Sequence, residues 1–172
     1  MTRATSKPQR RHSRTDTRIR SGRRKHRSGD SGPKIGVISD THGLIRPEAL
    51  AALEGVDAIL HAGDIGGEHV LEALRAIAPV TFVRGNNDDS DGYEIVRANI
   101  GGRRILLTHI FRPELLEEQT DVIVYGHSHK PHNEVVHGVL LFNPGSAGPR
   151  RFKLPVAIGM IEGDRARHIV LG

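Results

Sequence analysis

Five short motifs in this sequence are built from side chains that bind divalent metal ions. Carboxylate, amide and imidazole ligands without thiolate suit Mn, Fe, Co, Ni or Zn rather than Ca or Cu(I). The 172-residue chain contains no cysteine, which excludes thiolate zinc sites, iron–sulfur clusters, disulfides and a cysteine nucleophile. In chain order the motifs are Asp40-Thr-His42, Gly63-Asp64, Gly85-Asn86-Asn87-Asp88, His109 and Gly126-His127-Ser-His129.

Each motif directly follows an apolar run that is typical of a buried strand. The carboxyl ends of the strands of an open α/β sheet lie along one edge, so the motifs should meet there. One histidine at a strand end commonly has no such role, but five motifs at five expected strand ends favour a shared site. Seven ligands are too many for one tetrahedral ion and suit two ions that share a carboxylate. The seven candidates are Asp40, His42, Asp64, Asn86, His109, His127 and His129.

The elements that must position these motifs alternate between strand and helix in the first half of the chain. Helices are predicted at 47–54 and 67–77, between apolar runs, and this alternation is typical of a parallel sheet covered by helices. The second half predicts strands joined by glycine turns and one short helix at 113–119, which indicates a more antiparallel sheet. Strands are expected at 35–39, 57–62, 80–84, 93–100, 103–109, 121–125, 134–137, 139–142, 156–161 and 165–170.

Charge divides the chain at Pro33-Lys34. Residues 1–34 hold 12 basic and 2 acidic residues, a net charge of +10, whereas 13 basic and 18 acidic residues give 35–172 a net charge of −5. The first segment has too few apolar residues to form a core, so we expect a disordered basic tail at 1–34 and one folded domain at 35–172. Its arginines suit nucleic-acid phosphates. A tail of no specific function, or a start assigned too far upstream, is favoured over that role.

The remaining sequence features concern location and partners. No apolar run approaches the roughly 18 residues of a membrane span, and the basic segment lacks the apolar core of a signal peptide. We therefore expect a cytoplasmic protein with no membrane partner. The oligomeric state is left open.

The order of the five motifs across 35–150 resembles the calcineurin-like metallophosphoesterases. Asn143-Pro-Gly-Ser146, followed by Pro149-Arg150, is similar to the small single-domain phosphodiesterases of the YfcE-like family. The resemblance implies an α/β fold, a four-layer αββα sandwich in which two mixed β-sheets lie face to face and helices flank them. It also implies a hydrolase acting on phosphoric ester bonds, most simply a phosphodiesterase, with nucleotides among the candidate substrates.

The same resemblance assigns roles residue by residue. It implies two divalent metal ions, Mn²⁺ first, with Ni²⁺, Fe²⁺, Zn²⁺ or Co²⁺ as alternatives. Asp64 would bridge the two ions and hold the hydroxide that attacks phosphorus. Apart from the resemblance, Asp88 is expected to orient Asn86 or Asn87. Ser146 and Arg150 are expected to contact substrate, with a simple turn as the alternative for Ser146 and a solvent-exposed face as the alternative for Arg150. The ligand sets are Asp40, His42, Asp64 and His129 for one ion, and Asp64, Asn86, His109 and His127 for the other.

The chain departs from the family pattern at two positions. Asn87 stands where many members have a histidine; an amide donates a hydrogen bond in the transition state but does not transfer a proton. Ile110 stands where glycine usually follows the lone histidine, and His132 is a further candidate for contact with substrate. The alternative function is a non-catalytic or nucleic-acid-associated interaction module of the same fold, but such a module has no reason to keep all seven ligands.

Overall fold

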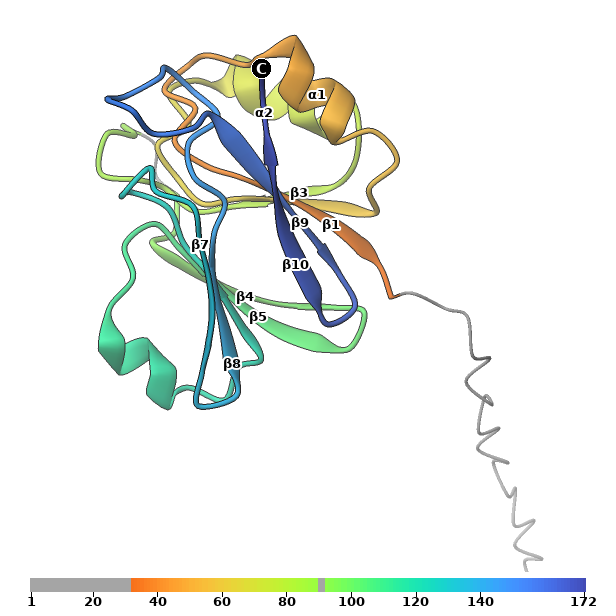
Figure 1. Ribbon diagram of the computed structural model, residues 1–172, viewed down its shortest axis with the longest axis vertical. Coiled ribbons are helices and arrows are strands. Elements are labelled where there is room, and N and C mark those ends of the chain that lie inside the picture. Colours follow the sequence, from red (N-terminus) through yellow and green to blue (C-terminus); the bar gives the residue numbers. More distant parts are fainter. Residues whose placement is uncertain (1–31, 90–91) are drawn as a thin grey trace, which may run out of the picture. The chain divides into compact units, whose positions relative to one another are not determined.

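The computed structural model describes residues 32–89 and 92–172 (Figure 1). The tail predicted at 1–34 lies outside the described residues except for its last three. Lys34 already belongs to the first strand, where its backbone N–H donates to Asp57 Oδ2 at 2.7 Å, so the folded part begins one residue before the predicted boundary.

The helices and strands follow the predicted order with small shifts at their ends. The first half contains β1 (Lys34–Ile38), α1 (Pro47–Ala52), β2 (Ala58–His61), α2 (Glu68–Arg75) and β3 (Val80–Phe82). The second half contains β4 (Ile95–Ile100), β5 (Arg103–Thr108), the 3-10 helix η1 (Pro113–Glu117), β6 (Val122–Val124), β7 (His132–Val136), β8 (Val139–Asn143), β9 (Ala157–Glu162) and β10 (Arg165–Val170).

The first sheet has the strand order β10-β9-β1-β2-β3. β1, β2 and β3 are parallel, as the alternation of strands and helices predicts. β9 pairs with β1 in antiparallel fashion, with Ile35 opposite Ile161, and β10 completes this edge. Helix α1 begins at Pro47, where the missing N–H costs no intrahelical bond. Helix α2 buries Val70 and Leu74 against the sheet.

The second sheet has the strand order β4-β5-β6-β8-β7. Its three central strands are parallel and its two outer strands are antiparallel to their neighbours. The prediction of a more antiparallel second sheet is therefore wrong. Each sheet has two parallel and two antiparallel pairings, because β9 and β10 join the first sheet instead of the second.

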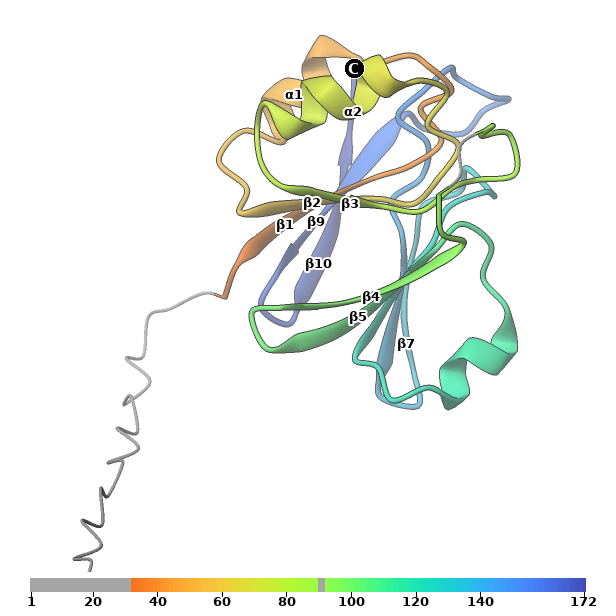
Figure 2. The same cartoon turned by 180° about the vertical axis from the view of Figure 1, so that it is seen from behind.

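Two sheets lie face to face, with α1 and α2 on the outer face of the first and η1 on the outer face of the second (Figures 1 and 2). The layer between the sheets contains Val37 and Leu60 from the first sheet and Leu107 and Phe142 from the second. The predicted four-layer α/β sandwich is confirmed, although the second outer layer is only a short 3-10 helix, whose Leu115 packs with Leu106 and Ile123 of the sheet.

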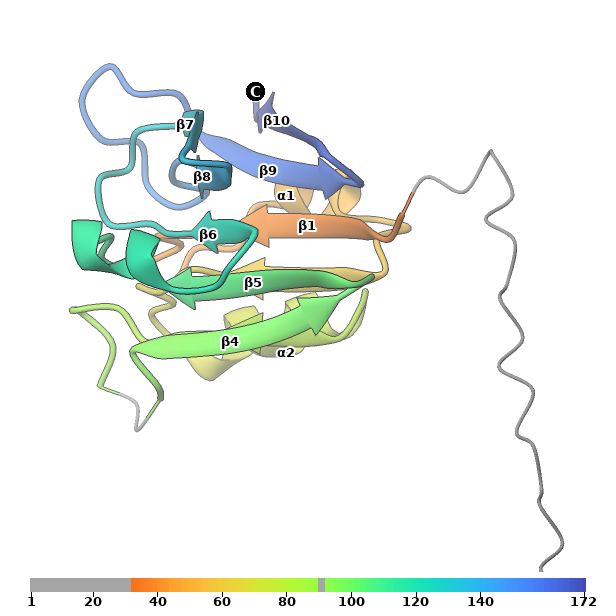
Figure 3. The same ribbon diagram turned by 90° about the horizontal axis from the view of Figure 1, so that it is seen from below.

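Parallel strands from both sheets run in similar directions: seen from below, the arrows of β1 in the first sheet and of β5 and β6 in the second point the same way (Figure 3). The loops after these strands consequently reach the same side of the molecule. Among the described residues, none of the helices has the length and apolar character needed to cross a membrane.

Candidate metal centre

The seven ligand candidates come from the loops that follow five strands. Three of these loops follow β1, β2 and β3 of the first sheet, and two follow β5 and β6 of the second. In strand order the residues are Asp40 and His42 after β1, Asp64 after β2, Asn86 after β3, His109 after β5, and His127 and His129 after β6. The distances between their side chains place them in two adjoining groups.

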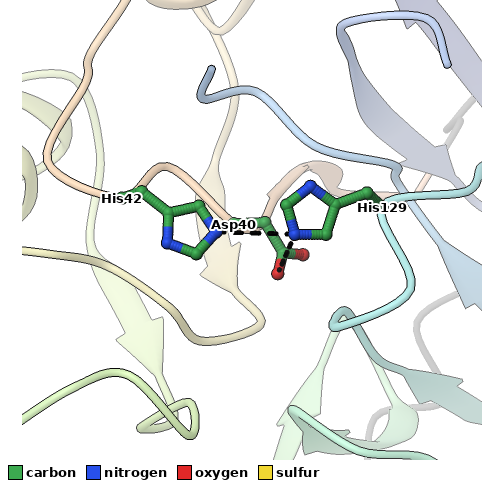
Figure 4. A group of neighbouring side chains, drawn as sticks. All are labelled: Asp40, His42 and His129. Atoms are coloured by element: carbon green, nitrogen blue, oxygen red, sulfur yellow. Dashed lines mark hydrogen bonds and ion pairs between the residues drawn. The ribbon is translucent and has the colours of Figure 1, made fainter. Parts of the chain in front are cut away.

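The first group consists of Asp40, His42 and His129 (Figure 4). His129 Nε2 lies 3.3 Å from Asp40 Oδ1 and 3.4 Å from His42 Nε2. The two imidazole rings are stacked, with centroids 5.3 Å apart and planes inclined by 20°. One ligand atom from each residue can therefore reach a common cation, because all three lie within 4.8 Å of one another.

The second group surrounds the amide oxygen of Asn86. Asn86 Oδ1 lies 3.0 Å from His109 Nε2 and 3.0 Å from His127 Nδ1. The His109 and His127 rings meet edge to face at 5.2 Å. His109 Nε2 also lies 3.6 Å from Asp64 Oδ1, which joins this group to the carboxylates.

Asp64 lies between the two groups. Its Oδ2 atom is 3.8 Å from His42 Nε2 and its Oδ1 atom is 3.6 Å from His109 Nε2. Both oxygens also accept hydrogen bonds from Asn87, from the backbone N–H at 2.9 Å and from the side-chain Nδ2 at 2.6 Å. These bonds fix the carboxylate so that each oxygen faces a different group.

The donor atoms fit divalent cations because several lone pairs face one another. His109 Nδ1–H donates to the Ala62 carbonyl at 2.7 Å, which leaves the lone pair of Nε2 directed at the oxygens of Asn86 and Asp64. Asp40 Oδ1 is buried and, within the described part of the chain, accepts no hydrogen bond. Nitrogen and oxygen lone pairs brought together in this way are stabilised by a cation between them.

Burial sets the protonation of these groups. Desolvation raises the pKa of Asp40 to about 7, and the charge of Asp64 acts in the same direction against a hydrogen bond from Ser39. Desolvation lowers the pKa of His129 to about 4 and also lowers the pKa of His109. The imidazoles of His129 and His109 are therefore neutral near pH 7, which is the form that binds metal.

The backbone has positive φ angles at five of the seven candidates. Residues other than glycine adopt this region uncommonly, although asparagine, aspartate and histidine do so more often than the rest. Such residues cost of the order of 1–3 kcal/mol each and gather at functional sites. The values are 54° for Asp40, 47° for His42, 53° for Asp64, 66° for His127 and 57° for His129.

Two buried serines hold the Asp40 loop in place. Ser39 Oγ donates to Asp40 Oδ2 at 2.6 Å, and the His127 backbone N–H donates to the same oxygen at 3.1 Å. Ser146 Oγ donates to the Asp40 carbonyl at 3.0 Å, and the Ser146 residue is only 5% exposed. Ser146, expected to contact substrate, is therefore placed as a support for the Asp40 backbone.

Asp88 also differs from its expected role. Its Oδ1 accepts backbone N–H groups of Ile65 at 2.8 Å and Gly66 at 3.0 Å, and its Oδ2 accepts that of Gly85 at 2.8 Å. Burial opposes ionisation, but these three bonds outweigh it and lower the pKa of Asp88. Asp88 thus ties together the loops after β2 and β3 through their backbones, not through the side chains of Asn86 or Asn87.

His61 is a supporting residue that the motifs do not reveal. Its ring is fully buried, its Nδ1 accepts the Gly63 N–H at 3.2 Å, and its Nε2 donates to Thr41 Oγ1 at 2.9 Å. Thr41 in turn donates to the Ile65 carbonyl at 2.9 Å. His61 therefore connects the loop of Asp40 and His42 with the loop of Asp64. The one feature of the sequence that points to this role is the position of His61 two residues before Gly63-Asp64. The same position also fits a strand residue that only packs in the core.

Two arginines lie beyond the first group. Arg150, expected to contact substrate, is exposed and donates to the Gly172 carbonyl at 3.5 Å. Its neighbour Arg151 is also exposed, and its positive charge makes a small contribution that opposes the burial-raised pKa of Asp40 and adds to the burial-lowered pKa of His129.

Comparison with known proteins agrees with the arrangement of these residues. Residues 34–165 match the model of the calcineurin-like phosphoesterase superfamily domain. A protein of Methanothermobacter thermautotrophicus named "Probable metallophosphoesterase" is 37% identical over 76% of this chain and 87% of its own length. Phosphodiesterase YfcE of Escherichia coli is 30% identical over 80% of this chain and 92% of its own length.

Solved structures show the same fold. An archaeal phosphodiesterase covers 80% of this chain and 99% of its own, with a TM-score of 0.70 and 26% identity. Vps29 of Entamoeba histolytica, solved in complex with Zn²⁺, covers 80% of this chain and 98% of its own, with a TM-score of 0.64 and 22% identity, and shows the fold alone. The family match, the two curated relatives and the clustered ligands together show that the chain belongs to the calcineurin-like phosphoesterase superfamily.

Proposed function

We propose that this chain is a phosphodiesterase that uses two divalent cations held side by side. The observation that carries the proposal is the place of Asp64, whose two oxygens face His42 at 3.8 Å and His109 at 3.6 Å. Carboxylates that bridge two cations are a common feature of phosphate-ester hydrolases with two metals. The phosphodiesterase names of the related proteins support the same reaction.

The ligands divide between the two groups. Asp64 is shared. We assign Asp40, His42, Asp64 and His129 to one cation, and Asp64, Asn86, His109 and His127 to the other. The mixture of imidazole, carboxylate and amide donors suits Mn²⁺, with Fe²⁺, Co²⁺, Ni²⁺ and Zn²⁺ as alternatives. When bound, two such cations activate water for attack on phosphorus and offset the charge on the phosphoryl oxygens.

The remaining residues orient the ester and the ligands. Asn87 Nδ2 uses one hydrogen to hold Asp64, and its second hydrogen is available to a phosphoryl oxygen. Arg151 adds positive charge beside the first group, where the substrate phosphate would lie. Ser39, Ser146, Asp88 and His61 hold the loops so that the ligands need little rearrangement on metal binding.

Hydrolysis of paired substrates tests the proposal. The full chain is stripped with chelator, reloaded with Mn²⁺ and assayed with bis(p-nitrophenyl) phosphate and p-nitrophenyl phosphate. We expect metal-dependent hydrolysis, with the diester cleaved faster than the monoester. The His127→Asn variant should lose at least about a hundredfold in turnover because one ligand is lost.

A matched control is available at the turn between β7 and β8. His137 is exposed and has a φ of 51°, close to the 66° of His127, so His137→Asn makes the same change in the same backbone region. This variant should keep the activity of the unmodified chain. Absence of metal-dependent hydrolysis, faster cleavage of the monoester, or equal effects of the two variants would contradict the proposal.

A further inference from the structure

We propose that a cavity beside Asn86 and His109 binds one organic substituent of the phosphodiester and that Arg112 selects substituents carrying an anionic group. The inference rests on the proposed phosphodiesterase function and names a substrate class for it. The juxtaposition that carries it is a cavity with a partly apolar wall and an arginine, opening beside two of the assigned metal ligands.

The cavity lies between the loop after β3, the start of β4 and the segment from β5 to η1. Its volume is about 270 Å³, slightly below the usual range for sites that hold drug-sized ligands. A substituent of the size of a single ring or a short chain fits such a space. Asn86 and His109 form part of its wall, so a phosphoryl group bound at the cations has a substituent directed into it.

The walls combine apolar surface with two guanidinium groups. Ile95, Ile110 and Leu115 supply the apolar part and Arg84 and Arg112 the positive charge, while Asp88 and Glu94 contribute two carboxylates. Ile110 follows His109 directly, lines the cavity and remains 39% exposed, so it offers apolar surface next to an assigned metal ligand. Carbon atoms of a substrate can bury this surface, while a charged end can reach a guanidinium.

The two arginines differ in their partners. Arg84 Nη2 lies 2.7 Å from Glu94 Oε1, so its charge is already matched within the cavity wall. Within the part of the chain that the structure describes, Arg112 forms no ion pair. A carboxylate or phosphate on the substituent can therefore pair with Arg112 without displacing an acid.

The neighbouring cavity lacks a basic side chain from the described part of the chain. Asn87 forms part of its wall and its volume is about 380 Å³, but Glu68, Asp88 and Asp89 supply three carboxylates. An anionic phosphodiester is repelled by three carboxylates at short range. The cavity at Arg112 is consequently the one that suits this substrate.

Two synthetic diesters with the same leaving group test the inference. Ethyl p-nitrophenyl phosphate and 2-carboxyethyl p-nitrophenyl phosphate both release p-nitrophenolate and differ in one carboxylate. For the full chain loaded with Mn²⁺ we expect a KM about three- to tenfold lower for the carboxyethyl ester, the range of a partly exposed charge-assisted contact. The two kcat values should agree, because the contact is remote from the reacting bond.

Variants at Arg112 identify the cause. Arg112→Ala should remove the preference and Arg112→Glu should reverse it. Arg165→Ala is the control, since Arg165 is an exposed arginine on β10, paired with Glu162 at the end of the sheet away from the metal centre. Hydrolysis of both esters without a preference, or a preference that survives Arg112→Ala, would overturn the inference alone. Failure to hydrolyse either ester with any of the metals would overturn the proposed function and the inference with it.

Discussion

Asn87 is the side chain that most affects how the leaving group departs in the proposed reaction. Its amide contacts Asp64 and supplies no transferable proton. His132 is a poor substitute, because Nδ1 lies 2.6 Å from Tyr125 Oη and Nε2 lies 3.2 Å from Glu134 Oε2. Both ring nitrogens are thus occupied on the outer side of the second sheet. The leaving alkoxide must therefore depart largely unprotonated.

This absence of a proton donor predicts a strong dependence on the leaving group. General acid catalysis contributes about 10²–10⁴-fold, so diesters of weakly basic phenols should be cleaved far faster than diesters of alkyl alcohols. A series of aryl and alkyl phosphodiesters of rising leaving-group pKa measures the slope. Asn87→His should make the slope shallower, with Asn133→His on β7 as the control substitution. Equal cleavage of alkyl and aryl esters by the unmodified chain would show that another group donates the proton.

His61 predicts a particular dependence of stability on pH. Burial lowers the pKa of its imidazole from 6.5 to about 3. Between these two values the unfolded chain binds a proton at His61 that the folded chain does not, so the free energy of unfolding falls as pH falls through this interval. Asp40 acts in the opposite sense: its raised pKa of about 7 makes the metal-free protein lose stability as pH rises from about 4 to 7.

Substitution separates the two contributions. His61→Gln removes the titrating group, and loss of its buried hydrogen bonds should cost about 1–3 kcal/mol at pH 7. The difference from the unmodified chain should shrink as pH falls toward 4. Urea unfolding in chelator at pH 7, 5.5 and 4 measures it, with His137→Asn as an exposed control. A difference that stays constant with pH would show that His61 does not carry the acid sensitivity.

At the scale of elements, close backbone contact between two loops shapes the centre. Gly85 follows β3, and a Cβ atom at this position would fall on the backbone nitrogen and Oδ1 of Asp64. Gly85→Ala should therefore displace the shared carboxylate, lower stability by about 1–3 kcal/mol and weaken metal binding. Calorimetric titration with Mn²⁺ and thermal unfolding measure the two effects.

A matched glycine provides the control. At Gly32 a new Cβ would meet Gly163 Cα at 3.7 Å, an ordinary contact, so Gly32→Ala should leave both properties unchanged. Equal metal affinity for Gly85→Ala and the unmodified chain would contradict the close approach seen here.

The strands and helices could be predicted from the sequence because each is a local pattern. The apolar run of β1 and the Pro47 start of α1 lie within a residue of their expected positions. The partition of strands between sheets could not be predicted, because β9 pairs with β1 across more than a hundred residues and its sequence does not encode the partner. The segment at 113–119 was expected to be helical, and only Pro113–Glu117 forms a helix, of the 3-10 type.

For the candidate site, the sequence predicted the ligands but not the residues that support them. The ligand candidates occur in motifs with fixed spacing, and the structure brings all of them together. Their supports were not predictable, because Ser146 and His61 act through hydrogen bonds to residues distant along the chain, and Ser39 acts through a bond to its neighbour Asp40 that depends on how the chain turns there. A serine or a buried histidine in a strand carries no pattern that distinguishes this role.

At the scale of the whole molecule, the uneven charge of the chain provides a test of nucleic-acid binding by residues 1–34, the role that the sequence favours less than a tail of no specific function; if that role holds, binding is sensitive to salt. Residues 1–34 carry +10 and residues 35–172 carry −5. Arginine-rich segments bind polynucleotide by releasing counterions, and this effect weakens strongly as salt rises. Retention of the full chain on immobilised polynucleotide should therefore fall steeply between about 50 and about 200 mM salt. A chain that begins at Gly32 should not be retained but should hydrolyse aryl diesters at the same rate. Equal retention of both chains would place the binding elsewhere.

The assignment of Asp64 as the ligand shared by two cations is tested most directly by the number of metal ions bound per chain. The protein is saturated with Mn²⁺, freed of excess metal by gel filtration and analysed by mass spectrometry of the elements, beside Asp64→Asn and the exposed control Asp164→Asn. The side chain of Asp164 is 100% exposed. We predict about two ions per chain for the unmodified protein and the control, as a binuclear site requires, and fewer than about one for Asp64→Asn, because the charge that holds both cations is lost. One ion per chain in the unmodified protein, or two in Asp64→Asn, would contradict the shared ligand.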